Sequence, residues 1–131
     1  MEFESWGDYM AWKLDSDRPI YSQVVERLQT RIVAGECAPG SRLPSVRDLA
    51  MEAGINPNTM QRAFAELERQ GLVTTQRTSG RLVTEDEALI QRVRAEMAAG
   101  KVREFLTQLE EMGFSRGEVV DLLGKVGGSD L

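Results

Sequence analysis

The 131-residue chain contains no histidine and a single cysteine, Cys37. Without histidine it lacks the commonest metal ligand and the side chain most often used as a general base, and one cysteine cannot form a disulfide within the chain. No apolar run approaches the ~20 residues needed to span a bilayer. These absences argue against a membrane protein and a disulfide-bonded secreted protein, and we expect a protein of the reducing cytoplasm.

Few groups in the sequence could support catalysis. Cys37 has no evident activating partner, and no glycine-rich phosphate loop follows a predicted strand. The cluster of Glu85, Asp86 and Glu87 could suggest acid–base work or a hard metal, but acidic residues at a helix start are explained by the helix dipole. We therefore expect no enzyme activity, no metal and no cofactor.

The net charge of −5 conceals an uneven distribution. Residues 1–17, 18–83 and 84–131 carry net charges of −4, +3 and −4, and every positive charge in the middle segment is an arginine. The planar arginine side chain suits both phosphate and guanine. An ordinary solvated surface of mixed charge would have the same composition. Composition alone therefore does not distinguish it from an anion-binding surface, and the motifs must do so.

Residues 18–83 show the pattern of three helices. Apolar residues recur every four positions from Pro19, a suitable first helical residue, and Ser45 and Asn56 are suitable caps for the second and third helices. Each predicted helix ends at a glycine: Gly35, Gly54 and Gly71. Only Gly54 and Ile55 separate the second helix from the cap of the third, so these two must cross steeply, as in a helix-turn-helix.

A β-hairpin is predicted after the third helix, with strands LVTTQ and RLVT joined by a turn that contains Gly80. The predicted fold is mainly α with a small β-hairpin wing, a winged helix-turn-helix followed by a helical segment. We divide the chain into an N-terminal extension, 1–17, a DNA-binding domain, 18–83, and a C-terminal dimerisation segment, 84–131.

The third predicted helix carries a polar face suited to reading DNA. Asn58, Gln61, Arg62 and Ala65 share one side at helical spacing. Asn and Gln can pair with adenine, Arg can pair with guanine, and Ala leaves room for a thymine methyl. The alternative is an ordinary solvated face.

Backbone-binding groups are expected nearby. The helix starts at Ser45 and Asn56 offer N–H groups for phosphate, and Arg47 could reinforce the first of them or form a surface salt bridge with Asp48 or Glu52. Further DNA-binding candidates flank or occupy the hairpin turn: Arg77, Thr78, Gly80 and Arg81.

These motifs together resemble the GntR family of bacterial transcription regulators. They are the PG followed by LPSVRDLA, the INPNT helix start, the A-F-x-x-L-x-x-x-G-L-V close and the hairpin after it. The resemblance covers about residues 18–83, and NPNT is similar to the YtrA-like branch and to MocR-type proteins. It implies that the wing tip contacts DNA, and that residues of the second and third helices do so too: Arg47, Asn56, Asn58, Thr59 and Gln61. Thr78 and Leu82 depart from the usual wing pattern of glycine and aromatic residues, whereas Gly80 is kept.

The C-terminal segment predicts three amphipathic helices. The first is capped by Thr84 and Glu87 and ends near Gly100, the second ends at Gly113, and Ser115 caps the third with Glu118 as its partner. About 45 residues cannot enclose a drug-sized ligand pocket within one chain. Some apolar stripes should pack on the chain's own DNA-binding domain, and the dimerisation candidates are Leu89, Val93, Met97, Val102, Phe105, Leu106, Leu109 and Leu122. The resemblance to the YtrA-like branch implies a dimerisation module here.

The sequence therefore predicts a homodimeric regulator that binds palindromic double-stranded DNA, with repression implied by the family resemblance. The alternative is a winged helix that binds only protein, since fold does not fix function. An apolar cluster of Trp6, Tyr9, Met10 and Trp12 could complete the core or bind a small-molecule effector of unknown identity.

Overall fold

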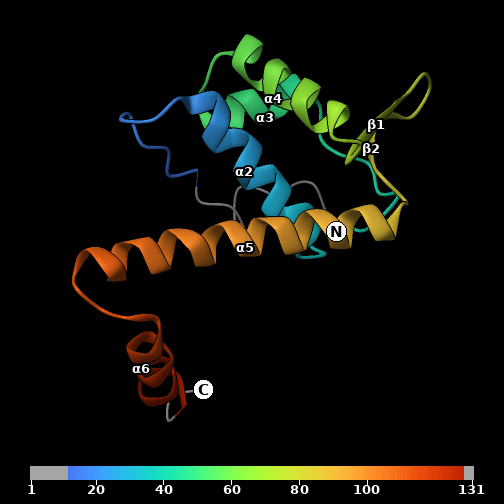
Figure 1. The fold of residues 1–131 in the computed structure, drawn as a ribbon. Helices are drawn as coiled ribbons and strands as arrows, with labels where there is room; N and C mark the ends of the chain where they lie inside the picture. Colours follow the sequence, from blue (N-terminus) through green and yellow to red (C-terminus); the bar gives the residue numbers. More distant parts are fainter. Residues whose placement is uncertain (1–11, 129–131) are drawn as a thin grey trace. The chain divides into compact units, whose positions relative to one another are not determined.

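The computed structural model describes residues 12–128, and the chain divides into two units with the boundary after Arg94. The elements in chain order (Figure 1) are α2 (Ile20–Val33), α3 (Val46–Ala53), α4 (Pro57–Arg69), β1 (Val73–Gln76), β2 (Gly80–Val83), α5 (Glu87–Glu111) and α6 (Arg116–Gly128). The first unit contains α2 to β2 and the start of α5. The predicted fold class, mainly helical with one two-stranded hairpin, is confirmed.

Local sequence signals set the ends of the helices in the first unit. Ser45 Oγ accepts a hydrogen bond from the Asp48 N–H at 3.0 Å, and Asn56 Oδ1 accepts one from the Asn58 N–H at 2.7 Å. Gly54 ends α3 in the left-handed conformation, which a residue without Cβ adopts at little cost. The predicted caps are confirmed, although α2 begins at Ile20 with Pro19 as its N-cap, one residue later than expected.

The core of the first unit surrounds α4. One side of this helix is fully buried, with an exposed fraction of 0% for each of its four apolar residues: Met60, Ala63, Phe64 and Leu67. Helices α2 and α3 both pack against α4. The opposite side of α4 is polar and lies on the surface, as is typical of an amphipathic helix.

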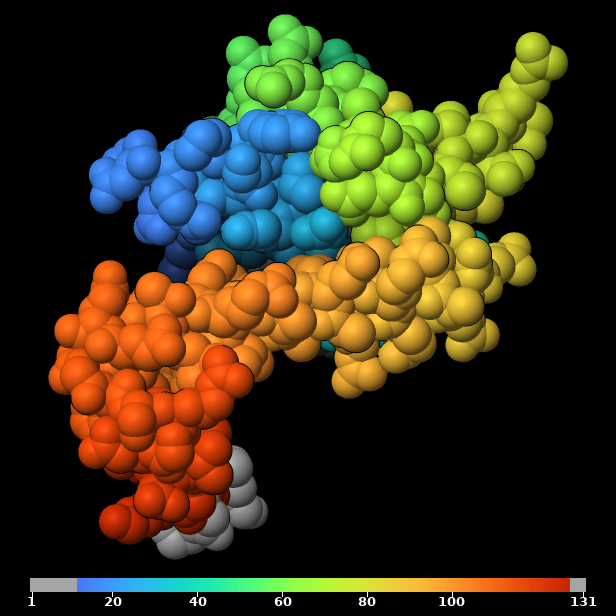
Figure 2. Space-filling model, viewed as in Figure 1, coloured from blue at the N-terminus to red at the C-terminus, as the bar shows by residue number. Residues whose placement is uncertain are grey.

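The predicted hairpin is present, with two four-residue strands, and its base is joined by a third segment that the sequence did not suggest. Strands β1 and β2 pair in antiparallel register from Val73↔Val83 to Gln76↔Gly80. The extended piece before Pro44 also pairs with β2, since the Leu43 N–H donates to the Arg81 carbonyl at 2.9 Å and Arg42 bridges to Leu82. At its base the hairpin is therefore paired with a third extended segment. Its outer half projects away from the helices (Figure 2).

The described part of the N-terminal extension is fastened to α2. The buried Gln23 side chain accepts a bond from the Asp15 N–H at 2.7 Å and donates to the carbonyls of Asp15 and Arg18 at 2.7 and 3.0 Å. Trp12 packs partly against the core. The other members of the predicted aromatic cluster, Trp6, Tyr9 and Met10, lie outside the described residues.

The expected break near Gly100 is wrong, because α5 runs without interruption from Glu87 to Glu111. Gly100 is a single glycine among good helix formers, and one glycine costs only about 1 kcal/mol in a helix. The predicted cap is also shifted, since Asp86 rather than Thr84 accepts the bond from the Leu89 N–H, at 3.0 Å. Thr84 instead accepts from the Asp86 N–H.

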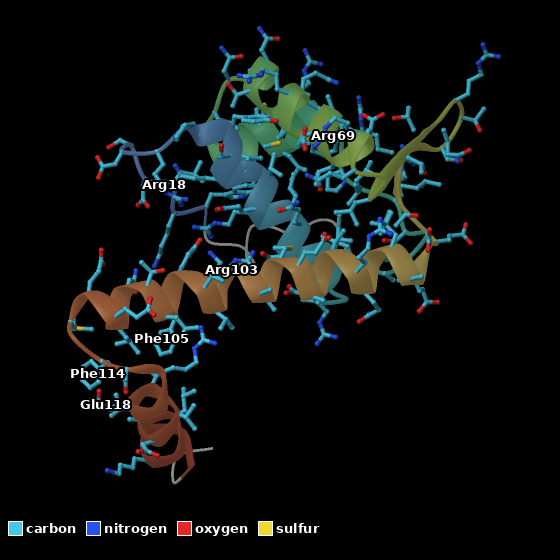
Figure 3. The ribbon with its side chains drawn as sticks, viewed as in Figure 1. Arg18, Arg69, Arg103, Phe105, Phe114 and Glu118 are labelled. Carbon is cyan, nitrogen blue, oxygen red and sulfur yellow. The ribbon has the colours of Figure 1, made fainter. Side chains whose placement is uncertain are left out.

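The second unit contains the remainder of α5 and the whole of α6. Ser115 and Glu118 form the predicted capping box, since each side chain accepts a bond from the other residue's backbone N–H, at 3.2 and 2.9 Å. Figure 3 shows Phe105, Phe114 and Glu118 around the corner between the two helices. Within residues 12–128, the helices are all too short or too polar to cross a membrane.

Replacing Gly100 with alanine is expected to stabilise the protein by about 0.5–1 kcal/mol, because alanine loses less backbone entropy in a helix. The added methyl group meets only the Arg103 side chain, 3.9 Å away. Urea unfolding followed by circular dichroism at fixed protein concentration measures the change. As a control, Gly113→Ala should destabilise by about 1–2 kcal/mol because Gly113 has a positive φ of 93°. A loss of stability in Gly100→Ala would contradict an uninterrupted α5.

Candidate nucleic-acid interface

The exposed side of α4 brings together the residues that sequence reasoning selected for base contacts. Asn58, Gln61, Arg62 and Ala65 are all exposed, and Thr59 is half-buried beside them. They occupy the side of α4 opposite the buried stripe. This exposed side has no acidic residue before Glu66, which lies at its edge. This surface therefore offers amide and guanidinium groups at helical spacing to whatever approaches α4.

The two helix starts differ in how many backbone N–H groups they leave available. At α4, Pro57 has no N–H, the Asn58 N–H bonds to the Asn56 side chain, and the Thr59 N–H bonds to the Asn56 carbonyl at 3.0 Å. At α3, the N–H groups of Val46 and Arg47 have no acceptor among residues 12–128. The start of α3 thus leaves more N–H groups available to an anion, although Asp48 places a carboxylate in its first turn, and Asn56 acts first as a structural cap.

Arg47 is exposed on the first turn of α3. The surface salt bridge considered for it does not form, since neither Asp48 nor Glu52 lies within ion-pair distance in the described part of the chain. Its charge is therefore available next to the free N–H groups of α3, where both would attract a phosphate.

Arg62 has a partner that the sequence did not reveal. Its guanidinium carbon lies 4.4 Å from the centre of the Tyr21 ring, a cation–π contact between α4 and α2. Such a contact at an exposed site contributes about 0.5–1 kcal/mol and limits the directions that a long side chain can take. Tyr21 lies beside the apolar stripe of α2. The sequence does not show that it faces Arg62, because that depends on how α2 and α4 cross.

A second network lies along the edge of the same face. Glu66 accepts hydrogen bonds from the Arg69 guanidinium and from Gln70 Nε2, and Gln29 of α2 donates to Gln70 at 2.8 Å. These bonds, led by those from Arg69, lower the pKa of Glu66 to about 2. Arg69, labelled near the end of α4 in Figure 3, therefore has its charge neutralised within the helix.

The wing residues fall into two groups. Arg77, Thr78 and Gly80 are exposed at the hairpin tip, and Gly80 has the positive φ of 77° that favours glycine there. Arg81 instead points at α4, where its Nε donates to Glu68 Oε1 at 3.3 Å and its guanidinium lies 5.4 Å from the Phe64 ring centre. The structure therefore places Arg81 apart from the tip residues with which the sequence grouped it.

Sequence reasoning missed Arg42, which lies beside the wing. Arg42 is exposed, and its guanidinium lies 3.7 Å from the position that a Cβ on Gly80 would occupy. Its signal was the basic residue in the extended SRLP segment, but only the pairing of that segment with β2 brings it to the hairpin.

The dimerisation candidates divide according to the unit that contains them. Leu89 and Val93 pack partly against the core of the first unit. In the second unit Val102 and Phe105 are exposed, with exposed fractions of 54% and 41%. The remaining candidates are half-buried: Met97, Leu106, Leu109 and Leu122.

Reactive groups are scarce in the described part of the chain. Burial raises the pKa of the Cys37 thiol, and a hydrogen bond with Arg31 offsets only part of this effect. A thiol of raised pKa is a poor nucleophile at neutral pH. Within residues 12–128 the acidic and cysteine side chains form no cluster that could hold a metal ion.

Comparison with known proteins gives a consistent result. The family model for bacterial regulatory proteins of the gntR family matches residues 20–83. The HTH-type transcriptional regulator YhcF of Bacillus subtilis is 33% identical over 109 residues, which cover 83% of this chain and 90% of YhcF. The HTH-type transcriptional repressor YtrA of the same organism is 34% identical over 97 residues, covering 74% and 70% of the two chains.

Two solved structures extend the similarity to the fold. A GntR family transcriptional regulator from Listeria monocytogenes superposes with a TM-score of 0.79 at 34% identity, covering 86% of this chain and 98% of the other. YtrA from Sulfolobus acidocaldarius, a GntR-family transcription factor, has a TM-score of 0.54 at 29% identity and covers 69% of this chain and 99% of its own. The likeness therefore reaches beyond the helix-turn-helix.

Replacing Arg69 with alanine is expected to raise the pKa of Glu66 from about 2 toward the usual range of a glutamate, because the carboxylate loses its hydrogen bonds from the guanidinium. The pH dependence of the Glu66 carboxyl carbon shift, followed by NMR, measures this change. Because the pKa is lowered on folding, the network stabilises the protein fully above the usual glutamate range and loses that effect as the pH falls toward 2. Arg47→Ala, which does not touch Glu66, should leave the titration unchanged; an equal shift there would refute the assignment.

Proposed function

Because this chain belongs to the gntR family of bacterial regulatory proteins and is similar to its YtrA-like members, we propose that it represses transcription by binding an inverted-repeat operator as a homodimer. Its general role, a DNA-binding helix-turn-helix regulator rather than an enzyme, follows from the family. The finer statement rests on the chemistry of the described residues. The relative YtrA carries the name of a repressor, and repression by covering a promoter is the simplest use of such a protein.

The observation that carries the proposal is the division of α4 into a buried and an exposed side. Asn58, Gln61 and Arg62 are exposed on a helix whose apolar side is wholly enclosed. Asn and Gln can each pair with adenine, and Arg with guanine, across the major groove, which admits an α-helix. In our proposal these three side chains read the bases of one half-site.

Contacts to the DNA backbone come from α3 and the wing in this proposal. The available N–H groups of Val46 and Arg47, together with the Arg47 side chain, would hold one phosphate, with Ser45 fixing the helix start. Arg77 at the exposed hairpin tip would reach a second position on the backbone or in the minor groove. Such contacts position the protein and supply most of its salt-dependent affinity.

Dimerisation is supported by the surface of the second unit. Val102, Phe105, Met112 and Val120 are large apolar residues with exposed fractions between 41% and 64%. A small unit that exposes several such residues gains by burying them against a second copy, and symmetric pairs are the commonest oligomers. Two copies related by a two-fold axis would present two α4 helices to half-sites about one helical turn, ~10 bp, or a multiple of it apart.

Duplexes selected from a random pool by the purified protein are expected to contain an inverted repeat. Gln61→Ala and Arg62→Ala should each cost about 1–3 kcal/mol and relax preference at one position per half-site, because each removes a bidentate partner. Arg47→Ala should weaken binding to all sequences alike and reduce the salt slope by about 1. Quantitative shift assays over a salt series measure both effects.

Arg92→Ala serves as the control for that experiment, since it removes an exposed cation outside the proposed interface. It should leave the selected sequence and its affinity unchanged. If the protein selects no duplex at low ionic strength, the DNA-binding proposal fails and the alternative, a winged helix that binds only protein, gains support.

Sedimentation equilibrium of the free protein is expected to show a dimer that Phe105→Glu weakens at least about tenfold, because a buried charge replaces buried aromatic area. Val102→Glu should act in the same direction. The matched control is Met51→Glu, a charge introduced at an apolar residue of the first unit with an exposed fraction of 75%. A wild-type monomer, or a dimer indifferent to both changes in the second unit, would refute this assignment.

A further inference from the structure

Glu68 joins the proposed recognition helix to both strands of the wing. Its Oε2 accepts a hydrogen bond from Thr75 Oγ1 of β1 at 2.6 Å, and its Oε1 accepts one from Arg81 Nε of β2 at 3.3 Å. The Glu68 and Arg81 side chains are only 31% and 26% exposed. Partial shielding from water strengthens the bond between these two side chains relative to that of a fully exposed pair.

Thr75 and Arg81 are direct cross-strand partners in the hairpin register. The Glu68 carboxylate therefore bonds to both residues of one cross-strand pair, which we call the Thr75–Arg81 rung of the hairpin. The same rung is fixed from two other directions, since the Arg81 guanidinium lies over the fully buried Phe64 ring and the Arg81 carbonyl accepts the Leu43 N–H. Beyond this rung the hairpin has only exposed residues.

We propose that Glu68 is a positioning residue for DNA binding, and that Arg81 belongs to this clamp rather than to the DNA-contacting set. The clamp fixes the angle between α4 and the wing tip, so that the helix and Arg77 meet DNA as one preformed surface. Fixing two binding elements in advance spares the entropy of ordering them on binding. The inference rests on the proposed function, because it assumes that α4 and the wing engage the same duplex.

The sign of the effect separates this role from simple electrostatics. A carboxylate near a polyanion repels it, so removing the Glu68 charge without any other consequence would tighten DNA binding. If Glu68 positions the wing, its removal weakens DNA binding instead. With duplexes that the wild-type protein selects from a random pool, Glu68→Ala is expected to bind about tenfold more weakly, and Thr75→Val severalfold more weakly.

Glu52→Ala is the matched control, because Glu52 is an exposed glutamate of α3 with no hydrogen bond or ion pair in the described part of the chain. It should leave affinity unchanged or raise it slightly. Melting curves establish that each variant folds; should Glu68→Ala not fold, Thr75→Val carries the comparison. Affinity equal to or above wild type in the folded clamp variants would overturn the proposal.

Two further readouts distinguish positioning from a contribution to stability alone. In an Arg77→Ala background, Glu68→Ala should cause little additional loss, because the wing tip it positions no longer contacts DNA. Arg81→Ala should weaken binding without changing the salt slope, whereas a lost phosphate contact would reduce the slope by about 1. Additive losses with Arg77→Ala, or a reduced slope in Arg81→Ala, would overturn the clamp while leaving DNA binding intact. Failure of the wild-type protein to select any duplex would overturn both.

Discussion

The complete enclosure of one side of α4 is the constraint on which the rest of the first unit depends. Phe64 and Leu67 are fully buried on a helix against which α2 and α3 pack, so a rotation of α4 about its axis would expose their apolar area and bury polar side chains in its place. Each exchanged side chain would cost on the order of 1.5–3 kcal/mol. The orientation of Asn58 and Gln61 toward solvent is thus a consequence of core packing and needs no further interaction to maintain it.

The arginines of the first unit differ in how far their charges are compensated. Arg69 and Arg81 are paired with Glu66 and Glu68, and Arg62 is stacked on an aromatic ring. Arg42, Arg47 and Arg77 have no ion-pair partner among the residues that the structure describes. The charges of the paired arginines are offset by carboxylates, whereas the uncompensated arginines carry the field that an anion would experience at long range. A modest net charge can therefore coexist with a basic binding surface.

Local chemistry made much of this structure predictable. The caps at Ser45 and Asn56, the helix ends at Gly35, Gly54 and Gly71 and the buried stripe of α4 depend on residues within one or two helical turns of one another, and all are confirmed. The exposed face of α4 followed from the same periodicity.

The sequence predictions were wrong or incomplete where a local pattern fits two structures, or where the contact that decides the structure joins residues far apart in the sequence. A lone glycine such as Gly100 either ends a helix or sits within it, and only the backbone angle distinguishes the two. The directions of Arg62 and Arg81 depend on contacts with Tyr21 of α2 and Glu68 of α4, made by long flexible side chains whose partners cannot be read from spacing. For the same reason, the role of Glu68 was invisible in the sequence.

The Gln23 amide has a consequence for the extent of the minimal folding unit. This side chain is 2% exposed, and its oxygen and nitrogen are both satisfied by the backbone of Asp15 and Arg18. Loss of these residues would remove three hydrogen bonds from the Gln23 side chain, each worth about 0.5–1.5 kcal/mol net of the bonds that water would make. Residues 15 to 18 therefore contribute to the stability of the first unit, although they precede residues 20–83, which the family model matches.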